Sequence, residues 1–133
     1  MSTIQAQLWK GSPFTIQRED GKTPNTVIFR LSGPFTARDM YGSLTPVALG
    51  KMLDFQSVTG SELPALNILD LTEVPYMDSA GLGIVVRHVV RCKSKGVRLV
   101  AAGVSSRVLE LFKMTKVDAI LPVIDTVEEA DTQ

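Results

Sequence analysis

The chain has few of the residue types on which most catalytic and metal-binding sites depend. Its 133 residues include one cysteine, Cys92, and one histidine, His88. A single cysteine cannot form an internal disulfide, which fits a reducing compartment, and a metal site built from clustered Cys and His ligands is excluded. The sequence contains neither GxGxxG nor GxxxxGKS/T, which removes two common phosphate-binding loops of nucleotide enzymes.

The sequence also lacks an excess of charge of one sign and a long hydrophobic run. Its 14 basic and 14 acidic residues give a formal net charge of zero, so we expect no nucleic acid as a partner. The longest apolar stretches are interrupted by Arg87, Arg91 and Arg98, which predicts no membrane insertion. The first residues lack the basic and apolar regions of a signal peptide, and we expect a cytoplasmic protein.

Apolar residues are numerous enough for a core. They make up 44% of the sequence, and a chain of this length has the size of one globular domain. No repeat, low-complexity tract or linker divides it. We expect a single domain over residues 14–133, preceded by an N-terminal extension over residues 1–13.

The first two predicted strands form an antiparallel hairpin. Residues 14–18 and 26–31 have the apolar and β-branched side chains of strands. The turn signals Asp20-Gly21 and Pro24-Asn25 lie between them, and a connection this short favours antiparallel pairing.

Three further strands are predicted. Residues 65–71 and 97–104 are mostly apolar, which is typical of strands buried on both faces. Residues 121–124 predict a short final strand, and Pro122 restricts it to an edge of the sheet because proline cannot donate a backbone hydrogen bond.

Helical patterns fill the segments between these strands. Thr36 and Asp39 resemble a capping box at the start of one helix, which we expect to break near residues 43–45 because Pro46 would clash with the preceding turn. Further helices are predicted at residues 79–95, after a cap at Ser105 or Ser106, and at residues 126–131. This order predicts an α/β fold with a mixed, mostly parallel sheet of about five strands and about four helices.

The helix at residues 79–95 has an apolar side and a polar side. We expect the buried side to contain Leu82, Val85, Val86, Val89 and Cys92. On this assignment Ile84 and His88 lie on the polar side with Arg91 and Lys95. Ile84 would then be an exposed apolar contact for a partner, and His88 a solvated histidine.

The start of this helix combines small and polar residues: Asp78-Ser79-Ala80-Gly81-Leu82-Gly83. Asp78 or Ser79 can cap the helix by accepting hydrogen bonds from backbone N–H groups, and capping alone is one interpretation. However, Gly81 and Gly83 each cost about 1 kcal/mol relative to alanine inside a helix. That cost favours a second interpretation, in which a phosphate or a partner approaches this backbone closely.

This junction, preceded by Leu69-Asp70-Leu71-Thr72-Glu73-Val74 and Tyr76-Met77, resembles the signature of STAS domains, and most closely that of the bacterial anti-sigma factor antagonists. The similarity extends from about Phe14 to Ala130 and includes Gly33 after the second strand. It also includes Ser106-Arg107-Val108-Leu109-Glu110-Leu111-Phe112 on the third helix. The chain departs from the family in its first helix region, which is longer and contains Gly42 and Pro46.

The resemblance implies a phosphorylation switch. In such proteins the serine directly after the aspartate, here Ser79, is phosphorylated by a partner that is both an anti-sigma factor and a serine kinase. The unphosphorylated form binds that kinase, the phosphorylated form is released, and a PP2C-type phosphatase resets the cycle. The resemblance implies no cofactor. The expected partner-binding residues are Asp78, Ser79, Ala80, Gly81, Gly83, Ile84, Arg87 and His88.

Three alternatives remain open. The chain can be a STAS subunit of a membrane lipid-transport complex, bound to an ATPase with Ser79 unmodified. It can also be a STAS module that binds a nucleotide or lipid at the bare helix N-terminus. The third alternative is an enzyme, but no general base for Ser79 is identifiable. We therefore expect no catalytic residue, no metal ligand and no enzymatic activity.

Overall fold

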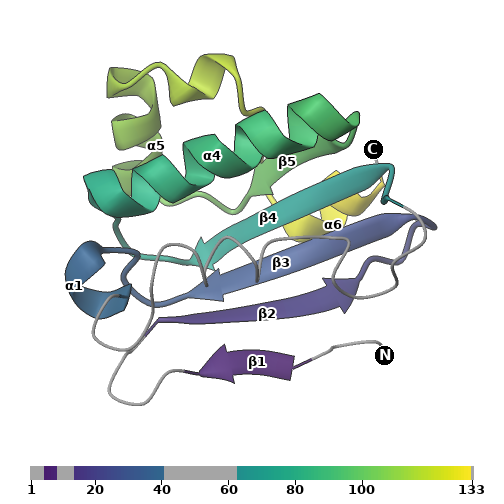
Figure 1. Ribbon diagram of the computed structural model, residues 1–133, viewed down its shortest axis with the longest axis horizontal. Helices are drawn as coiled ribbons and strands as arrows, with labels where there is room; N and C mark the ends of the chain where they lie inside the picture. Colours follow the sequence, from purple (N-terminus) through teal and green to yellow (C-terminus); the bar gives the residue numbers. More distant parts are fainter. Residues whose placement is uncertain (1–4, 9–13, 41–62, 133) are drawn as a thin grey trace.

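A mixed β-sheet forms the centre of the structure, a computed structural model that describes residues 5–8, 14–40 and 63–132 (Figure 1). Its strands are β1 (Gln5–Leu8), β2 (Thr15–Asp20), β3 (Thr26–Ser32), β4 (Leu66–Glu73), β5 (Arg98–Ala102) and β6 (Val123–Ile124). They follow the order β1-β2-β3-β4-β5-β6 across the sheet. The β1–β2 and β2–β3 pairs are antiparallel, and the remaining pairs are parallel.

The sheet confirms the predicted α/β fold and its antiparallel hairpin. The expected number of about five strands is met by β2 to β6, and β1 pairs with β2 as a further strand. β1 comes from the segment that the sequence sets apart as an extension. β6 lies at an edge and is shorter than predicted, because Pro122 has no N–H group to donate to a neighbouring strand.

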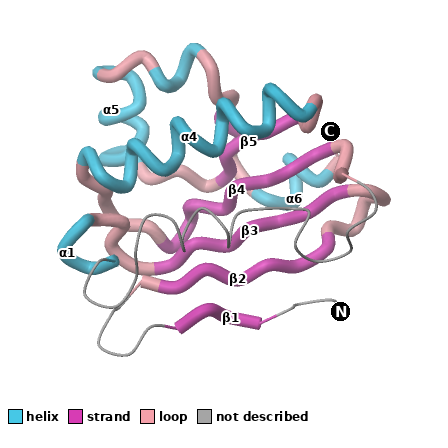
Figure 2. Tube along the Cα trace, in the orientation of Figure 1, coloured by secondary structure: helices cyan, strands magenta, loops and turns pink. Residues whose placement is uncertain are grey.

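Helices α4 (Ser79–Lys95) and α5 (Ser106–Met114) lie on one side of the sheet, and α6 (Val127–Asp131) lies on the other (Figures 1 and 2). α4 and α5 start where the sequence predicts, and α6 starts one residue later than predicted, at Val127. Ser105 caps α5 and Thr126 caps α6 through their side chains. In the described residues no helix has the length and hydropathy needed to cross a bilayer.

The remaining helical segments are short. α1 (Ala37–Met40) is a single turn after Thr36, and η1 (Val117–Ala119) is a 3₁₀ turn after α5. The expectation of about four helices is therefore slightly off, since three helices in the described part of the chain exceed four residues. The predicted break near residues 43–45 and the helical piece after Pro46 lie outside the described residues.

Hydrophobic clusters cover both faces of the sheet. The larger cluster lies between the sheet and helices α4 and α5, and Phe29, Leu69 and Phe112 are among its buried members. The smaller one lies under α6 and contains Ile68 and Val100. Successive residues of a strand point to opposite faces, so the neighbours Ile68 and Leu69 belong to different clusters. β4 is thus buried on both sides, as predicted, and a loop of residues 74–78 connects its carboxyl end to the start of α4.

Candidate functional site

The carboxylate of Asp78 holds the starts of two helices together. Asp78 has an extended backbone and is the N-cap of α4. Its Oδ1 accepts hydrogen bonds from the amides of Ala80 at 3.0 Å and Gly81 at 3.1 Å. Its Oδ2 accepts from the amide of Ala37, the first residue of α1, at 3.0 Å. Of the two predicted caps, Asp78 is therefore the one that the structure uses.

Ser79 is the first residue of α4, and its side chain is exposed. Because Asp78 accepts the capping hydrogen bonds, the Ser79 hydroxyl has no capping role. It lies at the end of the helix where unsatisfied N–H groups and the helix dipole favour negative charge. This position suits an exposed hydroxyl that receives an anionic group.

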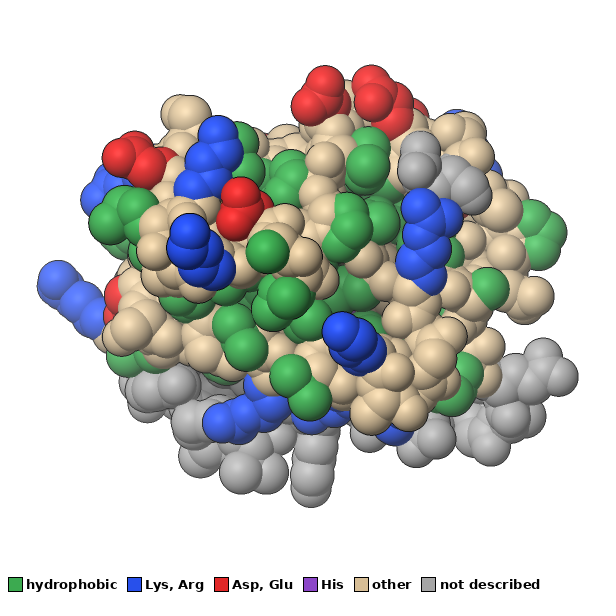
Figure 3. Space-filling model, turned by 90° about the horizontal axis from the view of Figure 1, so that it is seen from above, with side chains coloured by type: hydrophobic (Ala, Val, Ile, Leu, Met, Phe, Trp, Pro, Cys, Tyr) green, Lys and Arg blue, Asp and Glu red, His purple; other side chains and the backbone are tan. Residues whose placement is uncertain are grey.

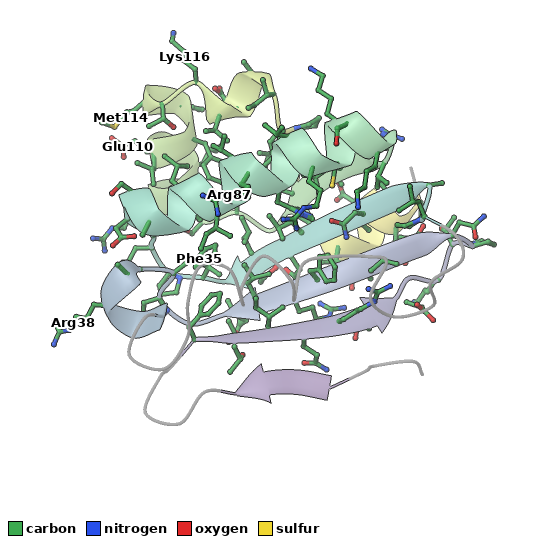
Figure 4. All side chains as sticks on the ribbon, viewed as in Figure 1. Phe35, Arg38, Arg87, Glu110, Met114 and Lys116 are labelled. Atoms are coloured by element: carbon green, nitrogen blue, oxygen red, sulfur yellow. The ribbon has the colours of Figure 1, made fainter. Side chains whose placement is uncertain are left out.

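Gly81 allows α4 to approach the loop between β3 and α1. A Cβ atom at position 81 would lie 2.1 Å from the carbonyl oxygen of Phe35. That loop is fixed at this point, because the Phe35 amide donates to the Tyr76 carbonyl at 3.0 Å and the Asp78 amide donates to the Phe35 carbonyl at 3.3 Å. Figure 4 shows Phe35 between the first turns of α4 and the sheet. The prediction that Gly81 keeps the surface open is wrong, since Gly81 is buried by this contact.

Gly83, in contrast, faces open space. A Cβ atom built at position 83 would have no neighbour within 4 Å. Arg87, one turn further along α4, is also exposed, and Ala80 is half-buried. The structure therefore brings Ser79, Gly83 and Arg87 to the surface of the first turns of α4, as the sequence predicts.

Ile84 and His88 are buried, which corrects their predicted position. Their exposed fractions are 6% and 1%. The helix is rotated relative to the prediction, so that Gly81, Ile84 and His88 turn inward while Leu82 and Val86 are only partly buried. The rotation follows from two contacts: the close approach at Gly81, and a hydrogen-bond partner for His88 on β4. Neither residue is an exposed partner contact.

The partner of His88 is Asn67, which the sequence analysis did not single out. The His88 Nε2 atom lies 2.7 Å from Asn67 Oδ1, and Asn67 Nδ2 donates to the carbonyl of Val27 at 2.9 Å. Since Oδ1 is then the acceptor, Nε2 of His88 is the donor. An amide side chain inside a mostly apolar strand was the signal for this contact, because buried polar groups need partners.

Burial controls the ionisation of His88 and Cys92, the two buried titratable side chains of α4. It lowers the pKa of His88 to about 4, and the charge of Arg91 contributes in the same direction. Burial also raises the pKa of the Cys92 thiol to about 12, against the opposite effect of Arg91 and Lys95. The imidazole is therefore neutral and the thiol protonated at pH 7, which makes Cys92 unreactive, as predicted.

The free energy of unfolding is expected to decrease between pH 7 and pH 5. Unfolded chains protonate His88 near its ordinary pKa of 6.5, whereas the folded chain does so only near a pKa of about 4. The folded pKa is the lower one, so proton uptake favours the unfolded state as the pH falls through this window. The expected loss at pH 5 is about 2 kcal/mol.

Urea unfolding followed by circular dichroism at a series of pH values measures this loss. His88→Gln removes the only histidine of the sequence and keeps a side chain able to donate to Asn67. The variant is expected to show a flatter dependence on pH than the parent. An equally steep decrease in both proteins would show that other groups cause it.

Tyr76 and Arg107 add a contact between the junction and α5. The Arg107 guanidinium lies 4.7 Å from the centre of the Tyr76 ring, in cation–π geometry. Tyr76 belongs to the loop between β4 and α4, and Arg107 to the first turn of α5. The contact places a positive charge beside the loop that ends at Asp78. Sequence patterns alone do not pair these two residues.

Comparison with known proteins agrees with the resemblance found in the sequence. The family model of the STAS domain matches residues 17–130. The anti-sigma-B factor antagonist of Listeria monocytogenes is 40% identical over 55 residues, which are 41% of this chain and 48% of that protein. The chain thus spans about half the length of the curated relatives it matches.

Solved structures share the fold. An anti-sigma factor antagonist from Mycobacterium paratuberculosis has a TM-score of 0.68 at 21% identity, over 90% of this chain and 92% of that chain. The Bacillus cell fate determinant SpoIIAA in its phosphorylated form has a TM-score of 0.60 at 20% identity, over 86% and 95%. The SulP transporter STAS domain from Vibrio cholerae has a TM-score of 0.63 at 23% identity, over 82% and 80%.

These structural likenesses, all below 25% identity, establish the fold. The family itself is established by the match over residues 17–130, which includes every strand from β3 onward and both longer helices. It also includes the junction at which Asp78 caps α4 and Ser79 is exposed. On this basis the chain belongs to the STAS domain family.

Proposed function

We propose that this chain is an anti-sigma factor antagonist controlled by phosphorylation of Ser79. In this proposal the unphosphorylated form binds an anti-sigma factor that is also a serine kinase, and phosphorylation of Ser79 ends the complex. A PP2C-type phosphatase would then restore the binding form. The names of the Listeria relatives and the phosphorylated form of SpoIIAA among the structural neighbours support this proposal.

One structural observation carries most of the argument. Asp78 uses both carboxylate oxygens to hold backbone amides of α4 and α1, while Ser79 beside it is exposed. A kinase can therefore reach the Ser79 hydroxyl without breaking the cap. In addition, Gly83 presents no side chain one turn later, which leaves room for the kinase at this surface.

The same position explains how a phosphate would act as a switch. The phosphate adds roughly −1.5 to −2 charges. Within the chain its cost is small, since the N-terminus of a helix stabilises an anion by about 0.3–1 kcal/mol, although Asp78 opposes it. In an interface built around a neutral hydroxyl, a desolvated dianion without partners is strongly unfavourable. The folded chain therefore tolerates the modification, and the complex does not.

The proposed partner surface is smaller than the sequence predicts. Ser79, Ala80, Gly83 and Arg87 remain as candidate contacts, because Ser79, Gly83 and Arg87 are exposed and Ala80 is only partly buried. Asp78 fixes the position of Ser79 because it caps the helix that Ser79 begins. Gly81, Ile84 and His88 are buried and set the orientation of α4, so their effect on a partner is indirect.

The test is incubation with ATP and each purified anti-sigma factor kinase from the genome that encodes the chain. We expect peptide mass spectrometry to find one phosphate, on Ser79. Ser79→Ala should retain binding and Ser79→Asp should weaken it by about a hundredfold, which corresponds to about 2.8 kcal/mol. Thr132→Asp is the control, since it adds the same charge at an exposed hydroxyl-bearing residue after α6, on the opposite side of the sheet from α4.

Two results would contradict the proposal. One is an unmodified Ser79 with every kinase tested. The other is equal weakening by Ser79→Asp and Thr132→Asp, because the effect would then depend on charge alone. Co-purification of the unmodified chain with a transport ATPase would favour a transport-complex subunit instead.

A further inference from the structure

The outer side of α4 has an apolar stripe. Leu82, Val86 and Val90 recur every four residues and therefore lie along one side of the helix. Leu82 and Val86 are partly buried, and Val90 is 60% exposed. On α5, Leu111 is partly buried and Met114 is 74% exposed. Together with the basic residues described next, these five side chains form the α4–α5 face.

Basic residues accompany this stripe. α4 contains four basic residues and no acidic one, and α5 contains two basic residues and one acidic one, Glu110. With His88 neutral, the two helices carry a net charge of +5 in a chain whose total is zero. Among the basic residues of these two helices, the exposed ones are Arg87, Lys93, Arg107 and Lys113.

Figure 3 looks onto this helix layer. Hydrophobic side chains gather in the middle of the view, with lysine and arginine side chains to the left, below and to the right of them and acidic side chains at the top and near the patch on the left. Figure 4 shows Arg87 on α4, and Glu110 and Met114 on α5. In contrast, residues 125–131, which include α6, contain four acidic residues and no basic one. Helices α4 and α5 are thus basic, whereas the segment that includes α6 is acidic.

We infer that the α4–α5 face is the docking surface for the anti-sigma factor kinase, and that the kinase presents to it an apolar patch bordered by acidic residues. This inference rests on the proposed function and specifies the chemistry of its partner. Complementary charge around an apolar centre is a common arrangement of protein interfaces.

The charge of this face makes Ser79 an effective place for a switch. Ser79 precedes Leu82 by one turn and begins the same helix. A phosphate there adds negative charge at one end of a surface that attracts an acidic partner through positive charge. It therefore weakens the complex in two ways: by its own desolvation, and by repulsion of the partner's carboxylates.

A protein surface fits the α4–α5 face better than an anionic lipid surface. Interfacial helices present large aromatic and leucine side chains to the lipid, whereas the stripe on α4 consists of one leucine and two valines. Glu110 would also be repelled by lipid phosphates. A protein partner can place a basic residue opposite it.

The experiment measures the dissociation constant of the complex with the kinase, by calorimetry, in about 0.05 M and about 0.5 M NaCl. The variant Arg87→Glu/Lys113→Glu reverses two charges of the α4–α5 face. Lys22→Glu/Arg98→Glu changes the net charge equally, at the β2–β3 turn and at the start of β5. Vesicles with about one-third phosphatidylserine serve as the lipid probe.

We expect the dissociation constant of the wild-type complex to rise at least about tenfold from low to high salt. At low salt, Arg87→Glu/Lys113→Glu should raise it about tenfold, and the control variant should change it less than about twofold. A complex that is insensitive to salt and to Arg87→Glu/Lys113→Glu, but is still lost with Ser79→Asp, overturns this inference and leaves the proposed function intact. Absence of binding to any kinase overturns both. Charge-dependent binding to vesicles without kinase binding assigns the face to lipid and likewise overturns the inference.

Discussion

Gly81→Ala is expected to lower the free energy of unfolding by about 3 kcal/mol or more. The added methyl group would lie 2.1 Å from the Phe35 carbonyl oxygen, well inside van der Waals contact. This oxygen belongs to backbone and accepts the Asp78 amide, so it cannot move without loosening the loop and the cap. Urea unfolding at pH 7 measures the loss.

Gly83→Ala is the matched control on the same turn of α4. Nothing lies within 4 Å of a Cβ atom at position 83, and alanine is the better helix former. The variant should therefore gain about 0.5–1 kcal/mol of stability. If the two variants changed stability by the same amount, helix propensity and not the contact with Phe35 would determine the effect.

Asp78→Ala is expected to cost about 3 kcal/mol, which exceeds the usual loss of about 0.5–2 kcal/mol for an N-cap. The reason is that three amides lose an acceptor: those of Ala80 and Gly81 on α4, and that of Ala37 on α1. Each partly buried donor left without an acceptor adds its own desolvation cost.

Asp78→Asn separates the contribution of the negative charge from that of the number of accepting oxygens. The asparagine side chain has one accepting oxygen, so it can serve α4 or α1 but not both. Its loss is expected to be about half that of Asp78→Ala, as measured by urea unfolding. Equal losses for the two variants would mean that the charge of Asp78, and not the number of accepting oxygens, holds the junction together.

Sequence patterns predicted most of the fold because most of its signals are local. The start of α4 depends on Asp78 and the start of β6 on Pro122, so neighbouring residues determine both. The alternation of strand and helix patterns along the sequence then predicted the parallel part of the sheet. The strand β1 was missed because Gln5 to Leu8 have no clear pattern and are held by pairing with β2.

The candidate site was predicted in part. Asp78, Ser79, Gly83 and Arg87 were placed correctly because their positions follow from the start of the helix. Ile84 and His88 were misplaced because the rotation of α4 depends on distant residues. Asn67 and Phe35 are 21 and 46 residues away from the residues they contact, His88 and Gly81, and no helical periodicity contains that information.

Separation of charge has a consequence for the rate at which a partner arrives. The chain is neutral overall, yet α4 and α5 are basic and the segment of residues 125–131 is acidic. Such a molecule has an electric dipole, and in the field of a charged partner it turns before the two surfaces touch. Encounters then begin in a favourable orientation more often than chance allows, and added salt slows association. Formal net charge therefore understates how selectively this protein meets other molecules.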